Sequence, residues 1–129
     1  MAANLTLCCL LGLVALCAGA AAQDPIDSFN VDEVLSNERL LKSYIQCMLD
    51  ANEGRCTKEG KEIKKRLPKF VENGCLDCPP TQLERAIKTL KHVTEQHPAD
   101  WAKLKAKYDP TGEFAKKHAE TWKQRGVNF

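Results

Sequence analysis

The sequence lacks a strong excess of charge of either sign. Its 129 residues include 19 Lys and Arg against 17 Asp and Glu, which gives a net charge of +2 at pH 7. Domains that bind nucleic acids usually carry a clear basic excess, because they neutralise phosphates. The balance therefore argues against a dedicated nucleic-acid surface, and we expect no nucleic-acid partner.

The motifs of the common enzyme classes are also missing. The chain has no H-E-x-x-H pair, no G-x-S-x-G nucleophile elbow and no glycine-rich phosphate loop. Its three histidines, His92, His97 and His118, fall in helical segments outside any such pattern. We therefore predict that the protein is not an enzyme, and we expect no catalytic residue, no metal site and no cofactor.

Long apolar runs are scarce, and the one that stands out is Leu5–Leu16. It is followed by the small residues 18–22, a pattern typical of a secretory signal peptide. The run is shorter than the roughly 20 residues that cross a bilayer, so we expect no stable membrane insertion. The sequence predicts a removed signal at residues 1–22, although cleavage after Ala20 fits nearly as well. Residues 23–129 then form one secreted, extracellular domain, which we expect to be a monomer.

Strand patterns are few, and helical periodicity dominates the rest of the chain. Apolar residues recur every three or four positions, which predicts an all-α domain of about six short amphipathic helices. The expected helices cover residues 30–35, 37–51, 58–72, 81–97, 98–108 and 114–122. Asn30 is expected to begin the first helix and Gly74 to end the third, while Thr81–Glu84 fits a capping box for the fourth.

The cysteines indicate disulfides. Seven are present, of which Cys8, Cys9 and Cys17 lie in the predicted signal. The other four are Cys47, Cys56, Cys75 and Cys78. A zinc site is disfavoured because the first two are too far apart for a usual ligand pair, and thiol redox catalysis is disfavoured because no strand precedes the C-x-x-C pair. An even number of cysteines in a secreted chain implies disulfides, but four cysteines allow three connectivities.

Six segments spread over residues 23–129 resemble the insect chemosensory proteins. They are Asn30-Val31-Asp32-Glu33-Val34-Leu35-Ser36-Asn37, Cys47-Met48-Leu49-Asp50, Cys56-Thr57-Lys58-Glu59-Gly60-Lys61-Glu62, Leu67-Pro68, the Cys75-x2-Cys78 pair and Tyr108-Asp109-Pro110-Thr111-Gly112-Glu113. The resemblance implies six helices around a hydrophobic channel, with the local disulfides Cys47–Cys56 and Cys75–Cys78. It also implies non-enzymatic binding of fatty acids, alcohols and other semiochemicals in lymph or haemolymph, with lipid transport and development as further roles.

The resemblance also marks departures from the family pattern. Ile26 stands where a tyrosine is common, and eight residues separate the first two cysteines where many members have six. The longer loop, residues 50–55, is expected to lie beside the binding region. Trp122 has no clear counterpart, and it either caps the core or lines the channel, with the cap favoured.

The leading hypothesis is a secreted carrier of small hydrophobic ligands. Tyr44 and Trp101 are the favoured contacts, because each joins an apolar body to a polar tip. The full set of predicted lining residues is Leu41, Tyr44, Ile45, Met48, Ile63, Leu67, Leu83, Ile87, Leu90, Trp101 and Leu104. The competing hypothesis is a secreted interaction protein with a filled core, which acts through its surface in development or defence.

Overall fold

The computed structural model describes residues 26, 28–52 and 54–129, and the predicted signal at residues 1–22 lies outside this part. The described residues form six helices and no strand, which confirms the all-α prediction. The helices are α2 (Val31–Ser36), α3 (Glu38–Leu49), α4 (Lys58–Asn73), α5 (Pro80–Gln96), α6 (Pro98–Tyr108) and α7 (Glu113–Gln124). Within the described ranges, no helix is both long enough and apolar enough to cross a bilayer.

Short polar residues and one glycine set several helix ends. The Asn30 side chain accepts a hydrogen bond from the Glu33 backbone N–H (3.1 Å), which begins α2 as expected. Asn37 ends α2 and begins α3, since its side chain accepts from the Leu40 N–H (3.1 Å). Gly74 ends α4 in the left-handed conformation, with φ of 67°.

The expected capping box at residues 81–84 is wrong. Helix α5 begins earlier, at Pro80, and Pro79 occupies the cap position without any side-chain hydrogen bond. Proline suits the first helical position because its φ is already helical and its missing N–H would have had no partner. With the two prolines at these positions, α5 begins one residue closer to the N-terminus than expected, and Thr81 lies inside its first turn.

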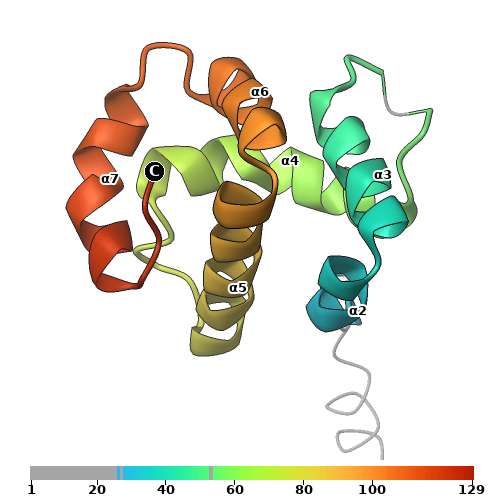
Figure 1. Ribbon diagram of the computed structural model, residues 1–129, viewed down its shortest axis with the longest axis horizontal. Helices are drawn as coiled ribbons and strands as arrows, with labels where there is room; N and C mark the ends of the chain where they lie inside the picture. Colours follow the sequence, from blue (N-terminus) through green and yellow to red (C-terminus); the bar gives the residue numbers. More distant parts are fainter. Residues whose placement is uncertain (1–25, 27, 53) are drawn as a thin grey trace, which may run out of the picture.

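Helix α4 spans the width of the molecule behind the others (Figure 1). Helices α2 and α3 stand at one end of α4, α7 stands at the other end, and α5 and α6 lie between them. Close backbone approaches join α2 to α3 and α5, α3 to α4 and α6, α5 to α6, and α4 to α6 and α7. Helices α2, α3, α6 and α5 thus form a closed ring of neighbours, α4 packs against α3 and α6 of this ring, and α7 packs against α4.

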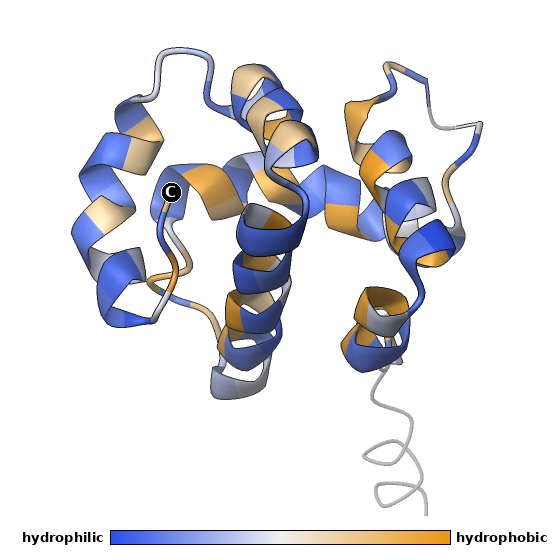
Figure 2. Ribbon diagram, in the orientation of Figure 1, coloured by the Kyte–Doolittle hydropathy of each residue, from blue (hydrophilic) through white to orange (hydrophobic). Residues whose placement is uncertain are grey.

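Two pairs of consecutive helices do not pack closely in the described part of the chain: α4 with α5, and α6 with α7. Among the described residues, no Cα of α4 lies within 8 Å of a Cα of α5, although the two helices are joined by a short turn. Along the ribbons of both helices, apolar residues alternate with polar ones (Figure 2). This separation leaves room in the middle of the fold.

The apolar core is divided into two clusters. The first cluster has Val34, Leu41, Ile45 and Val93 at its centre, and therefore joins α2, α3 and α5. The second cluster has Cys75, Trp122 and Val127 at its centre, with side chains of α4 and α5 packed against it. Helix α5 contributes to both clusters and is the element that links them.

Both disulfides are local. Cys47 pairs with Cys56 and Cys75 pairs with Cys78, in each case with 5.0 Å between the Cα atoms. The connectivity implied by the family resemblance is therefore the one in the structure. Each bridge closes a turn beside a helix end, so neither bridge joins elements that are distant in sequence.

Candidate functional site

A cavity of about 800 Å³ occupies the space between α4 and α5. Its wall includes residues from all six helices, from the Cys75–Cys78 turn and from the last residue, Phe129. The wall is predominantly apolar. The volume of the cavity lies within the range of about 300–1,000 Å³ that is usual for small-molecule sites. The cavity exists because α4 and α5 are held apart by the helices at either end.

All but two of the predicted lining residues lie on the cavity wall. They are Leu41, Tyr44, Ile45, Met48, Ile63, Leu67, Leu90, Trp101 and Leu104. Leu41, Ile45 and Met48 are also buried, so they serve the core and the wall at once. Contact between these side chains and a ligand remains a prediction.

Leu83 and Ile87, the other two predicted residues, do not lie on the cavity wall. Both pack against the second cluster, around Trp122. The face of α5 that borders the cavity includes Gln82, Ala86 and Val93, which are four and seven positions apart. Ala86 and Leu90 also pack against the second cluster but do lie on the wall, so this part of α5 borders both the cluster and the cavity.

The sequence analysis missed several wall residues. Six of them are Phe29, Phe70, Val93, Phe114, His118 and Phe129. Phe29 and Phe129 lie outside the helices, so no helical periodicity marks them. Phe70, Val93, Phe114 and His118 do lie on the predicted apolar stripes, and this was the signal that could have identified them.

Trp122 meets both expectations that were weighed for it. Its side chain is 2% exposed and lies in the second cluster, and it also forms part of the cavity wall. The Arg125 guanidinium lies 4.5 Å from the centre of its ring, and Arg125 Nη1 donates to the Gly74 carbonyl (3.0 Å). Helix α7 is thereby fixed against the end of α4.

The described residues of the longer loop, 50–52, 54 and 55, do not lie on the cavity wall. Instead, the carbonyl of Asp50 accepts hydrogen bonds from the side chains of Lys64 and Lys107. These bonds hold the start of the loop at the end of α3.

Most polar side chains on the wall already have partners. The Tyr108 hydroxyl donates to the Met48 carbonyl (2.6 Å), and burial raises its pKa above the ordinary value of 10.0. His118 Nε2 lies 2.8 Å from the Glu72 carbonyl oxygen. The Thr57 hydroxyl donates to the Tyr44 hydroxyl oxygen (3.3 Å). These bonds give the Tyr108, His118 and Tyr44 side chains partners within the protein.

Aromatic rings form a continuous row along the wall. Phe129 stacks on Trp101 with 5.5 Å between ring centres and lies 6.2 Å from Trp122, which in turn lies 5.9 Å from Phe70. At the other end of the cavity, Phe29 packs edge-on against Tyr44 at 5.2 Å.

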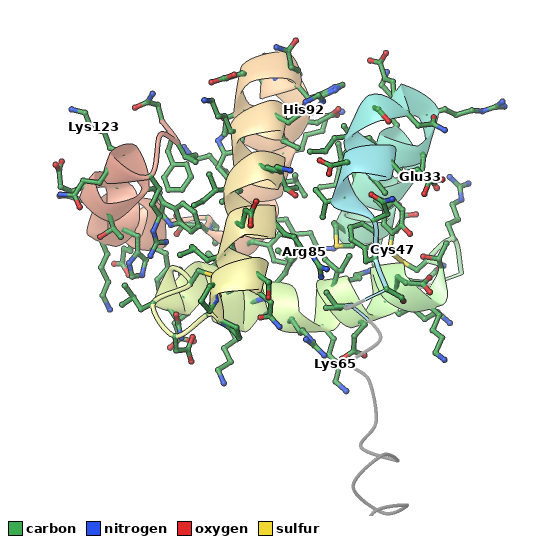
Figure 3. The ribbon with its side chains drawn as sticks, turned by 90° about the horizontal axis from the view of Figure 1, so that it is seen from below. Glu33, Cys47, Lys65, Arg85, His92 and Lys123 are labelled. Atoms are coloured by element: carbon green, nitrogen blue, oxygen red, sulfur yellow. A yellow bond between two sulfur atoms is a disulfide. The ribbon has the colours of Figure 1, made fainter. Side chains whose placement is uncertain are left out.

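In Figure 3 the Arg85 side chain extends from α5 toward α2, where Nη1 donates to the Ile26 carbonyl (3.0 Å).

Comparisons with known proteins agree with the resemblance seen in the sequence. Residues 23–116 match the model of the insect pheromone-binding family A10/OS-D. Ejaculatory bulb-specific protein 3 of Drosophila melanogaster is 35% identical over 118 residues, which cover 92% of each chain.

Solved structures give the same result. A chemosensory protein in complex with bromo-dodecanol is 39% identical, with a TM-score of 0.65 over 77% of this chain and 97% of that one. The antennal chemosensory protein A6 from the moth Mamestra brassicae is also 39% identical, with a TM-score of 0.61 over 77% and 95% of the two chains. On the motif, the relatives and the fold together, the chain belongs to the A10/OS-D family of insect chemosensory proteins.

Proposed function

We propose that the protein is a secreted carrier that holds long-chain apolar molecules in the cavity between α4 and α5. The observation that carries the proposal is the apolar cavity of about 800 Å³, bordered by both core clusters. A related chemosensory protein has been solved with bromo-dodecanol, which is a ligand of this type. The signal pattern at residues 1–22 and the local disulfides are consistent with secretion.

Burial of methylene groups supplies the binding energy in this proposal. Each buried methylene contributes about 0.8 kcal/mol, so a ten-carbon chain with most of its methylenes in the cavity gains about 7 kcal/mol before ordering costs. Those costs reduce the net affinity substantially. We therefore expect micromolar or weaker dissociation constants that tighten as the chain lengthens, until the ligand fills the cavity.

The experiment is a titration with an apolar fluorescent probe, followed by competition with fatty alcohols of increasing length. Saturable uptake that alcohols reverse supports the carrier. Absence of saturable uptake, with tryptophan emission unchanged, contradicts it and favours the competing hypothesis of a protein that acts through its surface.

Two alanines provide a matched pair of variants that locates the uptake. Ala86 lies on α5 at the cavity wall, whereas Ala119 lies exposed on α7 and away from the wall. Ala86→Phe places a ring in the cavity and is expected to weaken probe binding at least tenfold, while Ala119→Phe leaves binding unchanged. If both variants bind the probe as the parent does, the cavity is not the binding site.

A further inference from the structure

Trp101 differs from the other polar residues of the cavity wall. Its indole lies on the wall and stacks on Phe129, which also lies there. Its Nε1 atom is closed off from solvent and has no hydrogen-bond partner, and among the described residues it is the only buried side-chain nitrogen or oxygen in this condition. Buried donors are nearly always paired in folded proteins, because an unpaired donor loses its bonds to water without replacement.

The chemistry of this position is specific. An indole N–H donates one hydrogen bond and cannot accept any. The Tyr108 hydroxyl and His118 Nε2 each have a carbonyl partner at 2.6 and 2.8 Å, so they do not compete for the same acceptor. The wall therefore offers an unsatisfied donor within an apolar surround, and only a group with a free lone pair can complete it.

The ring stacked on this indole is the most exposed of the four rings in the aromatic row. Phe129 is 40% exposed, whereas Trp122, its other aromatic neighbour, is 2% exposed. Because Nε1 is closed off in this structure, a ligand atom reaches it only when the side chains around the indole move.

We propose that Trp101 Nε1 donates a hydrogen bond to an oxygen atom of the bound ligand, so that the cavity prefers chains with an acceptor group over plain hydrocarbons. The inference rests on the proposed carrier function and adds the class of ligand to it: alcohols, aldehydes, esters and carboxylic acids. A terminal ammonium group, which only donates, gains nothing at this position.

Nuclear magnetic resonance of the unmodified protein gives a direct test. The chain has two tryptophans, so ¹⁵N labelling yields two indole N–H signals, which the single Trp→Phe variants assign. Decan-1-ol is expected to move the Trp101 N–H proton downfield, as a new hydrogen bond does, and decane is expected to bind without that shift. A Trp101 signal that responds in the same way to both ligands overturns the inference.

Binding measurements on matched variants give the second test. Trp101→Phe removes the N–H and keeps an aromatic ring, and we expect about a fivefold loss of decan-1-ol affinity beyond any change for decane. Trp122→Phe makes the same chemical change at the other cavity tryptophan, and we expect the preference for the alcohol to be kept. An unchanged preference in Trp101→Phe, or an equal loss in both variants, contradicts the inference.

The outcomes also separate the inference from the function on which it rests. If neither decane nor decan-1-ol binds the parent protein, the carrier itself is refuted. If both bind and the Trp101 N–H proton does not distinguish them, the carrier stands and the donor role is refuted. If Trp101→Phe fails to fold, the spectra of the parent protein decide the question alone.

Discussion

The close approach of α4 and α7 at Gly74 yields a sharp stability prediction. Gly74 has φ of 67°, and a Cβ atom built on it would lie 2.6 Å from two atoms of the His118 ring. His118 is 5% exposed and is held by its contact with the Glu72 carbonyl, so the ring cannot simply turn aside. The substitution Gly74→Ala therefore combines backbone strain with a steric clash.

A second glycine separates these two effects. Gly112 has φ of 73°, but a Cβ atom there would meet nothing within 4 Å. Gly112→Ala is expected to cost only the left-handed strain of a non-glycine residue, about 1–2 kcal/mol. Gly74→Ala carries the same strain and, in addition, about 1–3 kcal/mol for forcing an extra group into a packed site.

Urea unfolding followed by circular dichroism measures the difference. We expect the midpoint to fall for both variants at nearly constant m-value, and to fall much further for Gly74→Ala. The double variant Gly74→Ala/His118→Ala removes the clashing ring, so the two substitutions should be less than additive by at least about 1 kcal/mol. Equal destabilisation by Gly74→Ala and Gly112→Ala, within about 0.5 kcal/mol, would refute the packing argument.

Three further predictions concern single contacts. Because the Tyr108 pKa is raised above 10.0, the stability that its neutral hydroxyl supplies is present below pH 10 and lost as the pH rises through the folded-state pKa. The thermal unfolding midpoint of the parent should therefore fall more steeply above pH 10 than the midpoint of Tyr108→Phe. Parallel curves of midpoint against pH for the two proteins would contradict this. Asn37→Ala removes the side-chain cap of α3 and should cost about 1 kcal/mol in urea, whereas Ser43→Ala on the exposed face of the same helix should cost little. Replacing both Cys75 and Cys78 by alanine should cost about 2 kcal/mol, and replacing Cys47 and Cys56, which close a longer ring, about 3 kcal/mol. The reverse order in a calorimetric comparison would contradict the ring-length argument.

Much of the fold could be predicted because each helix carries its own pattern. The apolar stripes locate all six helices, and Asn30 and Gly74 mark two of their ends correctly. The start of α5 was misplaced because two principles competed there. A capping box at Thr81 and a proline at the first helical position both fit the letters, and the proline prevails.

The cavity itself could be predicted only in part. A stripe identifies the side of a helix that faces inward, but it does not say whether that side meets another helix or an open space. Leu83, Ile87 and Leu90 belong to one stripe and all pack against the second cluster, but of these three only Leu90 also lies on the cavity wall. The position of Phe129 depends on the path of the chain after α7, which no periodic pattern encodes.

The division of the core into two clusters has a consequence for cooperativity. Helix α5 contributes side chains to both clusters, and α4 packs against α3 and against α7. In the proposed carrier, a ligand that contacts both clusters joins them through the cavity. At a free ligand concentration of a hundred times the dissociation constant, binding adds about 2.7 kcal/mol to the free energy of unfolding. We then expect amide hydrogen exchange in α3 and in α7 to slow together when ligand is bound. In the ligand-free protein we expect the two clusters to open separately.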